Sequence, residues 1–456
     1  MARSLQFIGG TGTVTGSKYL ITTKNNRILV DCGLFQGLKV LRERNRKPLP
    51  LSPRSISHVV LTHAHLDHSG YVPLLVKKGY SGEILSTRAT KALCGILLPD
   101  SGRLQEEDAH YANKHQFTKH EPALPLYTEK DARHCLKYFR TVEYHQSIKL
   151  SKNISFEYFR AGHIPGSCIV KFNLGGETVV FSGDLGRPIN NLLPQPDRVT
   201  DADVLVLEST YGDRVHDRED PEVLLERLIN KTVQRKGRIL IPAFAVGRTQ
   251  EILHFVIRLK KQNRIPQIPI YVDSPMATEA TRVFLSFSEE NRLTAEEAAD
   301  MRAHARFVDT TEESRALNDS KESAIIISAS GMATGGRVLH HLEHMADVPE
   351  NMIIFAGFQA AGTRGADMVA GARQIKVHGR MISVRAEIQC LDVLSAHADA
   401  DEIMQWLGGF RKPPRHTFIT HGEPQSSEAL RKRIQSELGW SASVPDYLET
   451  VSLDRL

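Results

Sequence analysis

The feature that most constrains this chain is a run of metal-binding side chains at residues 62–69, which read Thr-His-Ala-His-Leu-Asp-His-Ser. The run follows an apolar segment, 56–61, that predicts a buried strand, and it precedes residues 71–75, where the pattern indicates the start of a helix. Imidazole nitrogens and carboxylate oxygens suit borderline metals such as zinc. Surface turns also contain His and Asp, but this density of ligand groups favours a metal site on a strand-to-helix loop.

Further ligand-type residues stand at the ends of other predicted strands, between small residues or just before a helix. They are Asp31, His163, Asp184, Glu208, His397 and His421. Alone, each would be read as a turn former or a structural side chain. Together with the loop at 62–69, His163 and Asp184 complete a set for two metal ions, and Asp31 is expected to orient a ligand imidazole. Glu208, His397 and His421 are expected to converge on the same site.

The candidate ligands come from both ends of the chain, so the middle is predicted to be an insertion. From about residue 210 the pattern changes to helices alternating with apolar strands, as in a parallel α/β layer, and it continues to about residue 385. A chain of 456 residues is also long enough for two domains. We therefore expect a first domain formed by 1–209 and 388–456, interrupted by an inserted domain at 210–387.

Two glycine-rich loops in the middle of the chain each open a helix, at 242–250 and 328–337. Backbone amides at a helix N-terminus beside an arginine can bind phosphate. The candidate phosphate-binding residues are Arg248, Ser330, Gly331, Gly336 and Arg337. Connections between strands and helices generally favour such residues, so a purely structural role stays open.

The composition indicates the cellular compartment but does not identify the substrate. The net charge of +5 agrees with a polyanionic partner without requiring one. The five cysteines are scattered and odd in number, which argues against a disulfide framework and for a reducing compartment. No apolar stretch approaches the ~18 residues of a membrane span, and the first residues show no signal-peptide pattern, so we expect a cytoplasmic protein.

The sequence closely resembles the metallo-β-lactamase superfamily and, within it, the β-CASP nucleases, a branch that includes the cleavage and polyadenylation endonuclease subunit and RNase J. The resemblance runs over essentially the whole chain and rests on the His-x-His-x-Asp-His loop with its later partners. The branch is indicated by Glu208 with the following Ser-Thr-Tyr-Gly, by residues 242–250, and by His397 and His421. It implies an α/β fold, namely a metallo-β-lactamase αββα sandwich with an inserted α/β β-CASP domain.

The resemblance also implies a ligand set for two zinc ions. One ion is expected on His63, His65 and His163, the other on Asp67, His68 and His421, with Asp184 bridging both. Flavin-linked di-iron members of the superfamily usually carry Glu where His65 stands, which favours zinc. RNA-acting members of the branch tend to have a histidine at the position of His421, which favours RNA.

These observations predict a hydrolase, a zinc-dependent ribonuclease that cuts single-stranded RNA in RNA processing or decay and leaves 5′-phosphate and 3′-hydroxyl ends. Endonuclease action is the first expectation and 5′-to-3′ exonuclease action the second. Asp67, His397 and Glu208 are the candidate catalytic residues, with His397 protonating the leaving oxygen and Glu208 orienting it. Two alternatives stay open: a two-zinc hydrolase of thioesters or lactams, and a partner-dependent subunit of an RNA-processing complex. Besides single-stranded RNA, the partners considered are a second copy of the chain in a homodimer or an RNA-processing complex.

Overall fold

The computed structural model describes residues 3–115, 121–190 and 192–456, and the chain divides into two compact units. Unit 1 comprises Met1–Asn190, Pro194–Val215 and His397–Leu456, and unit 2 comprises Asn191–Leu193 and His216–Ala396. Unit 1 therefore takes its residues from both ends of the chain. The long segment of unit 2 overlaps the insertion predicted at 210–387.

The first sheet of unit 1 has the strand order β22-β1-β2-β3-β4-β5-β6. Strands β22, β1, β2 and β3 pair antiparallel, and β3, β4, β5 and β6 pair parallel. The bounds are β1 Ser4–Gly9, β2 Lys18–Thr22, β3 Arg27–Val30, β4 His58–Val60, β5 Glu83–Ser86, β6 Phe139–Thr141 and β22 Thr450–Ser452. The predicted strand at 56–61 is thus shorter in the structure.

The second sheet of unit 1 has the order β21-β20-β11-β10-β9-β8-β7. Here β21, β20, β11 and β10 pair parallel, and β10, β9, β8 and β7 pair antiparallel. The bounds are β7 Ile148–Ser151, β8 Ile154–Arg160, β9 Cys168–Leu174, β10 Thr178–Phe181, β11 Val204–Glu208, β20 His416–Thr420 and β21 Ala442–Ser443.

The two sheets pack face to face through alternating apolar side chains, as the two-residue period of a strand requires. In β8, Ile154, Phe156 and Tyr158 point into this shared core, and the rings of Phe7 and Phe418 meet across it at 5.0 Å between centroids. Burying such side chains contributes about 1.5–3 kcal/mol each.

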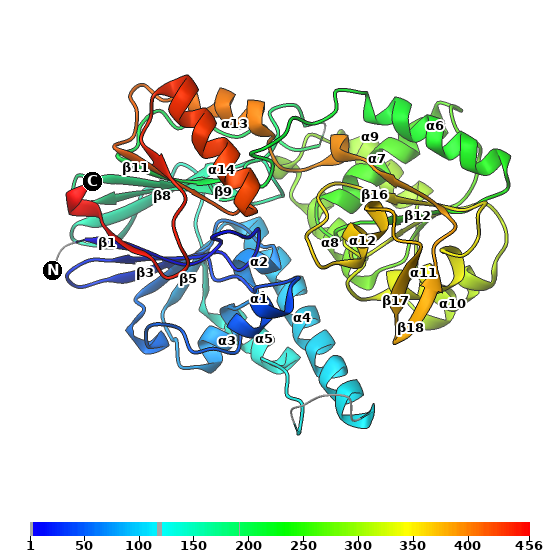
Figure 1. Cartoon of the computed structure of the whole chain (residues 1–456), viewed down its shortest axis with the longest axis horizontal. Coiled ribbons are helices and arrows are strands. Elements are labelled where there is room, and N and C mark those ends of the chain that lie inside the picture. The colour runs from blue at the N-terminus through cyan, green and yellow to red at the C-terminus, as the bar shows by residue number, and fades with distance from the viewer. Residues whose placement is uncertain (1–2, 116–120, 191) are drawn as a thin grey trace. The chain divides into compact units, whose positions relative to one another are not determined.

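Helices cover the outer faces of both sheets (Figure 1). Against the second sheet, α13 and α14 place Leu407 and Leu430 over Leu205 and Ile419. The remaining helices of unit 1 lie on the first sheet. Their bounds are α1 Lys39–Arg44, α2 Leu66–Ser69, α3 Val72–Lys77, α4 Arg88–His115, α5 Glu129–Cys135, α13 Ala400–Leu407 and α14 Pro424–Arg433. Unit 1 is therefore the predicted αββα sandwich.

Unit 2 is built on a parallel sheet with the order β14-β13-β15-β12-β16-β19, beside a two-stranded hairpin β17-β18. Its central strands are buried on both faces: Ile239 and Ile241 point to one helical layer, and Leu240 to the other. Uninterrupted apolar strands of this kind are typical of parallel sheets. The strand bounds are β12 Ile239–Pro242, β13 Ile270–Val272, β14 Arg306–Phe307, β15 Ile325–Ser328, β16 Met352–Phe355, β17 Gln374–Val377, β18 Arg380–Ser383 and β19 Glu387–Cys390.

The helices of unit 2 alternate with these strands, which confirms the predicted α/β pattern. Their bounds are α6 Pro221–Gln234, α7 Arg248–Lys261, α8 Pro275–Ser286, α9 Ala295–His304, α10 Thr311–Asp319, α11 Arg337–Met345 and α12 Arg364–Val369. Many begin with a side-chain cap; in α9 and α10 Thr294 and Thr310 accept from a backbone N–H three residues on.

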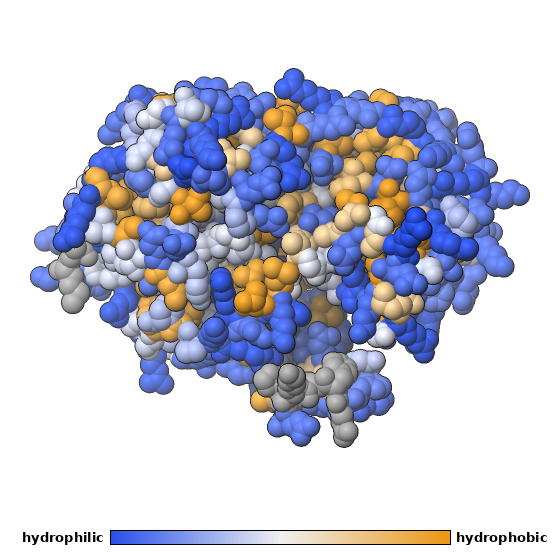
Figure 2. All heavy atoms as spheres, in the orientation of Figure 1, coloured by the Kyte–Doolittle hydropathy of each residue, from blue (hydrophilic) through white to orange (hydrophobic). Residues whose placement is uncertain are grey.

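The surface is that of an ordinary globular protein. Figure 2 shows hydrophilic residues over most of the visible face and apolar residues in separate patches. Within the described ranges we find no helix with both the length and the apolar character needed to cross a bilayer.

Candidate metal centre

The loop after β4 is fixed by close backbone packing against residues 32–34. Leucine 61 continues the chain from β4, and the helix α2 begins at Leu66, so Asp67 and His68 lie in a helical turn rather than in the loop itself. The N–H of Cys32 donates to the carbonyl of His68 at 2.7 Å. A Cβ at Gly33 would lie 1.6 Å from the carbonyl oxygen of Asp67, so this approach requires glycine.

Three histidine nitrogens and one carboxylate oxygen converge in a first cluster. His65 Nδ1 lies 3.2 Å from His63 Nε2 and 3.1 Å from His163 Nε2. Asp184 Oδ2 lies 3.4 Å from His63 Nε2 and 3.6 Å from His163 Nε2. Bonds of about 2.0–2.1 Å place the ligand atoms of a tetrahedral zinc site about 3.3 Å apart, so these separations match the edges of such a site.

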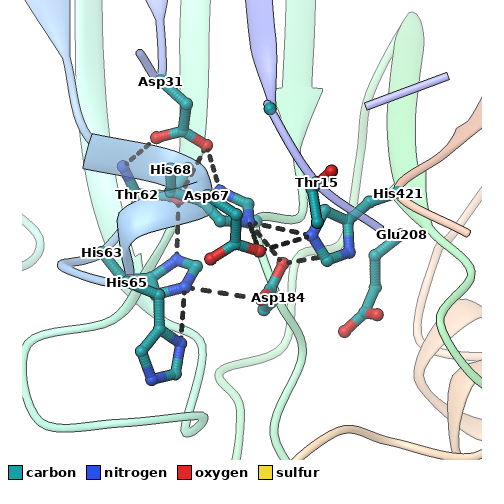
Figure 3. Close-up of polar contacts among 12 residues, drawn as sticks. Thr15, Asp31, Thr62, His63, His65, Asp67, His68, Asp184, Glu208 and His421 are labelled. Carbon is teal, nitrogen blue, oxygen red and sulfur yellow. Dashed lines mark hydrogen bonds and ion pairs between the residues drawn. The ribbon is translucent and has the colours of Figure 1, made fainter. Parts of the chain in front are cut away.

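A second cluster shares Asp184 with the first. His68 Nε2 lies 3.1 Å from His421 Nε2 and 3.1 Å from Asp184 Oδ1, and Asp67 Oδ2 lies 3.2 Å from His421 Nε2. The two oxygens of Asp184 thus face different clusters, and Figure 3 shows this carboxylate between the histidines. The structure therefore brings together all seven side chains predicted as ligands.

His421 reaches the centre from the C-terminal part of the chain, directly after β20. Its backbone is in the left-handed region, with φ of 48°, and its N–H donates to the carbonyl of Gly10 at 2.6 Å. The turn between β1 and β2 therefore holds the last ligand in place. Left-handed backbone is uncommon for a residue other than glycine and is often found at functional sites.

The charges of the two clusters fit a bound cation. Burial lowers the pKa of His65 to about 4 and that of His63 well below its ordinary value, so both imidazoles are neutral, as metal ligands must be. Burial opposes the charge of His68 as well, but the carboxylates of Asp184, Asp31 and Asp67 outweigh it and raise the pKa of His68 well above its ordinary value. The neutral nitrogens of His63 and His65, 3.2 Å apart beside the buried carboxylate of Asp184, fit the donor set of a divalent metal site.

Asp31 stands behind the second cluster. Its carboxylate accepts from the N–H of Thr62 at 2.7 Å, from the hydroxyl of Thr62 at 2.9 Å and from His68 Nδ1 at 2.7 Å. It is almost fully buried, so these contacts fix its orientation. Asp31 therefore contacts a ligand imidazole on the side away from the centre, as the predicted orienting role requires.

His397 and Glu208 lie beside the clusters. His397 Nδ1 is 3.2 Å from both oxygens of Glu208, and the His397 ring lies 4.4 Å from that of His163 between centroids. Glu208 also accepts from the N–H of Leu185 at 2.6 Å. Burial lowers the pKa of His397, but the Glu208 carboxylate more than offsets this, so the pKa lies above its ordinary value.

The predicted phosphate-binding residues lie in unit 2, and their arginines are engaged internally. Arg248 is 5% exposed and pairs with Glu251. Arg337 pairs with Asp273 at 2.7 Å and donates to the carbonyls of Val308 and Asp309 at 2.9 and 2.8 Å. Either arginine would have to leave these partners to bind phosphate.

The other predicted phosphate-binding residues, Ser330, Gly331 and Gly336, make contacts within their own loops or with the neighbouring loop. The Ser330 hydroxyl accepts from the N–H of Thr334 at 3.0 Å, and Gly336 precedes α11 with a φ of 81°. A Cβ at Gly331 would lie 2.9 Å from the ring of Phe244. These contacts explain the residue types structurally, and phosphate binding by the loops stays a prediction.

Two threonines at the centre, Thr62 and Thr210, are not among the residues predicted from the sequence. Thr62 contacts Asp31 and His63, and Thr210 contacts Glu208 and His421. Their position in the sequence could have identified them, because each lies within two residues of a ligand-type side chain at the end of a strand.

Comparison with known proteins connects this geometry with three family models. Residues 11–96 match the metallo-beta-lactamase superfamily, residues 249–368 the Beta-Casp domain, and residues 381–445 the Zn-dependent metallo-hydrolase RNA specificity domain. The first range contains the loop at 62–69, and the last contains His397 and His421.

Two proteins of similar sequence align with nearly the whole chain. Ribonuclease TTHA0252 of Thermus thermophilus is 37% identical over 93% of this chain and 94% of its own length. Transcription termination factor FttA of Pyrococcus abyssi is 32% identical over 98% of this chain and 70% of its own. A crystal structure of a protein of unknown function from Enterococcus faecalis covers 99% of this chain and 100% of its own at 13% identity, with a TM-score of 0.55, which is a likeness of fold alone.

Proposed function

The chain belongs to the β-CASP branch of the metallo-β-lactamase superfamily and is a metal-dependent hydrolase, and we propose that it is a two-zinc ribonuclease acting on single-stranded RNA. The observation that carries the proposal is the pair of clusters sharing Asp184, whose separations match the edges of tetrahedral zinc sites. One ion would be held by His63, His65 and His163, and the other by Asp67, His68 and His421.

RNA is favoured as the substrate by two findings. The family model that covers 381–445 describes an RNA specificity domain, and it includes His421, one of the proposed ligands. The relative from Thermus thermophilus, which aligns over nearly the whole chain, is named a ribonuclease. The excess of positive charge agrees with a polyanionic substrate. We also propose that the β-CASP domain is the insertion at 210–387, which contains the matched range 249–368.

The residues beside the clusters suit general acid catalysis. Bound zinc ions supply positive charge that polarises a phosphodiester and activates water for attack. Glu208 holds His397 through Nδ1, which directs the opposite nitrogen of the ring away from that carboxylate. The leaving 3′-oxygen needs a proton, and His397 donates it from Nε2, so the products carry 5′-phosphate and 3′-hydroxyl ends.

The experiment is cleavage of single-stranded RNA labelled at the 5′ end or at the 3′ end by the zinc-loaded protein. Internal fragments with 5′-phosphates support an endonuclease, and mononucleotides released from the 5′ end support an exonuclease. His397→Ala should lower the cleavage rate about 10²–10⁴-fold and leave the zinc content unchanged, because the histidine moves a proton and holds no ion.

Asp67→Ala is the matched variant in which both zinc content and cleavage should fall. Loss of zinc in His397→Ala would instead make His397 a ligand and contradict its assigned role. Absence of RNA cleavage by a protein that holds two zinc ions would contradict the proposal and favour a partner-dependent subunit or a hydrolase of small molecules.

A further inference from the structure

Thr62 and Thr210 each place a hydroxyl at the metal centre, and each hydroxyl has one proton to donate in a hydrogen bond. A hydroxyl donates one hydrogen bond and accepts others, so a hydroxyl that donates to a carboxylate can only accept from its remaining neighbours. A carboxylate is the preferred acceptor, because hydrogen bonds to an ionised group are the stronger ones. Where the remaining neighbour is a histidine nitrogen, that nitrogen must carry the proton.

Thr62 meets this condition on one side of the centre. Its Oγ1 donates to Asp31 Oδ2 at 2.9 Å and lies 3.1 Å from His63 Nδ1. His63 Nδ1 is therefore the donor to Thr62, which leaves His63 Nε2 unprotonated. That nitrogen is the one that faces His65 and Asp184 in the first cluster.

Thr210 meets the same condition on the other side. Its Oγ1 donates to Glu208 Oε2 at 2.6 Å and lies 3.2 Å from His421 Nδ1, and Thr210 is 3% exposed. His421 Nδ1 therefore donates to Thr210, and His421 Nε2 is left to face His68 and Asp67 in the second cluster. A second acceptor for the hydroxyl, the carbonyl of His421, is more distant at 3.3 Å.

The two arrangements have the same composition although they come from different strands. In each, a buried carboxylate accepts from one threonine and from one histidine Nδ1: Asp31 from Thr62 and His68, and Glu208 from Thr210 and His397. In each, the threonine accepts from a further histidine. Each carboxylate thus orients two imidazoles, one directly and one through a hydroxyl.

From this geometry we infer that Thr62 and Thr210 are positioning residues that fix the Nδ1–H tautomers of His63 and His421, so that both histidines present Nε2 to the metal ions. The inference rests on the ligand set of the proposed function. Its general basis is that partners behind a ligand histidine set the tautomer and affect metal affinity about 10–100-fold.

The test measures zinc affinity by competition with a chromophoric chelator, which does not depend on turnover. Thr62→Val and Thr210→Val keep the side-chain shape but remove the hydroxyl, and each should weaken zinc binding about 10–100-fold. Thr62→Ser and Thr210→Ser keep the hydroxyl and should restore affinity to within a few-fold of the starting protein. Valine variants that bind zinc as tightly as the starting protein, or serine variants as weak as valine, would overturn the inference.

Thr420→Val is the matched control. Thr420 is buried beside His421, but its hydroxyl contacts Tyr19 and the carbonyl of Leu207. This variant should keep its zinc affinity; an equal loss would show that any buried hydroxyl matters and would overturn the tautomer explanation.

Nitrogen-15 NMR of the imidazoles in the zinc-loaded starting protein gives an answer that needs no variant. Protons on Nδ1 of His63 and His421 are expected, and protons on Nε2 would overturn the inference even if the valine variants failed to fold. Failure of the proposed function looks different, because the starting protein would then bind no zinc or would bind two ions without cutting RNA.

Discussion

Asp184 in unit 1 and Asp273 in unit 2 are both buried aspartates that follow a strand and contact histidine, yet their surroundings differ in one respect. Asp273 follows β13 and accepts from Arg337 at 2.7 Å, from Ser314 at 2.5 Å and from His341 Nε2 at 2.7 Å. Asp184 follows β10, and within the described parts of the chain its ion-pair partners are all histidines. One carboxylate has a permanent cation beside it and the other does not.

This difference separates a structural site from a metal site. A buried carboxylate that pairs with a guanidinium and accepts further hydrogen bonds has its negative charge neutralised within the protein. A buried carboxylate surrounded by imidazoles, of which His63 and His65 are kept neutral by burial, has no permanent positive charge beside it among the described residues, and a bound cation would supply one. Counting permanent positive charges around a buried aspartate is therefore more informative than counting histidines.

Exchanging each aspartate for asparagine tests this distinction most directly. Asp184→Asn removes the charge that both clusters share, so zinc content should fall and RNA cleavage should drop by more than the about 10²–10⁴-fold expected for loss of a general acid. Asp273→Asn should retain both zinc and cleavage. The measurements are metal analysis after gel filtration and cleavage of labelled RNA; a zinc-loaded Asp184→Asn protein would refute the distinction.

The second prediction concerns stability. Asp273→Ala removes an acceptor from the buried His341 and from the partly exposed Arg337, so the free energy of unfolding should fall by about 3–5 kcal/mol. Urea unfolding followed by circular dichroism measures the change. Trp406 and Trp440, the only two tryptophans, both lie in unit 1, so fluorescence reports that unit separately. An unchanged midpoint by circular dichroism would show that Asp273 does not hold unit 2 together.

Arg337 is expected to stabilise unit 2 rather than to bind phosphate. Because its guanidinium bonds to Asp273 and two carbonyls, Arg337→Ala should lower the free energy of unfolding by about 1.5–3 kcal/mol and leave the salt dependence of RNA binding unchanged. Binding of labelled RNA across a salt series tests this. A slope reduced by about one, which is the loss of a phosphate contact, would restore the phosphate-binding interpretation.

The smallest effect expected is on pH dependence. Burial raises the pKa of Asp273, but hydrogen bonds from His341, Ser314 and Arg337 outweigh it and hold the pKa below its ordinary value. The resulting stabilisation is present above the unfolded-state pKa of about 3.9 and is lost as the pH falls through the lower folded-state value. The stability difference between the starting protein and Asp273→Asn should therefore shrink between neutral and strongly acidic pH. A constant difference in urea midpoint would contradict this.

The sequence predicted most of the fold because its signals are local. The predicted strand at 56–61 contains β4, the helix predicted to start at 71–75 is α3, and the alternating pattern from about residue 210 to about residue 385 corresponds to the strands and helices of unit 2. The metal cluster could be predicted because four of its side chains occur within six consecutive residues.

What could not be predicted depends on contacts between distant residues. A Gly-Gly-Arg sequence at the start of a helix has the same local pattern whether the arginine binds phosphate or, as here, an aspartate that precedes it by 64 residues. The roles of Thr62 and Thr210 likewise depend on which carboxylate each hydroxyl reaches. Hydroxyl direction is set by tertiary packing, and sequence spacing gives no information about it.

The hydrogen bond from the His421 N–H to the carbonyl of Gly10 has a consequence for biosynthesis. Six of the seven proposed ligands are translated by residue 184, but the seventh follows only after unit 2 has been made. A nascent chain on the ribosome therefore carries an incomplete centre until its first and last segments have met. The order of synthesis postpones assembly of the complete seven-ligand centre until nearly the whole chain exists.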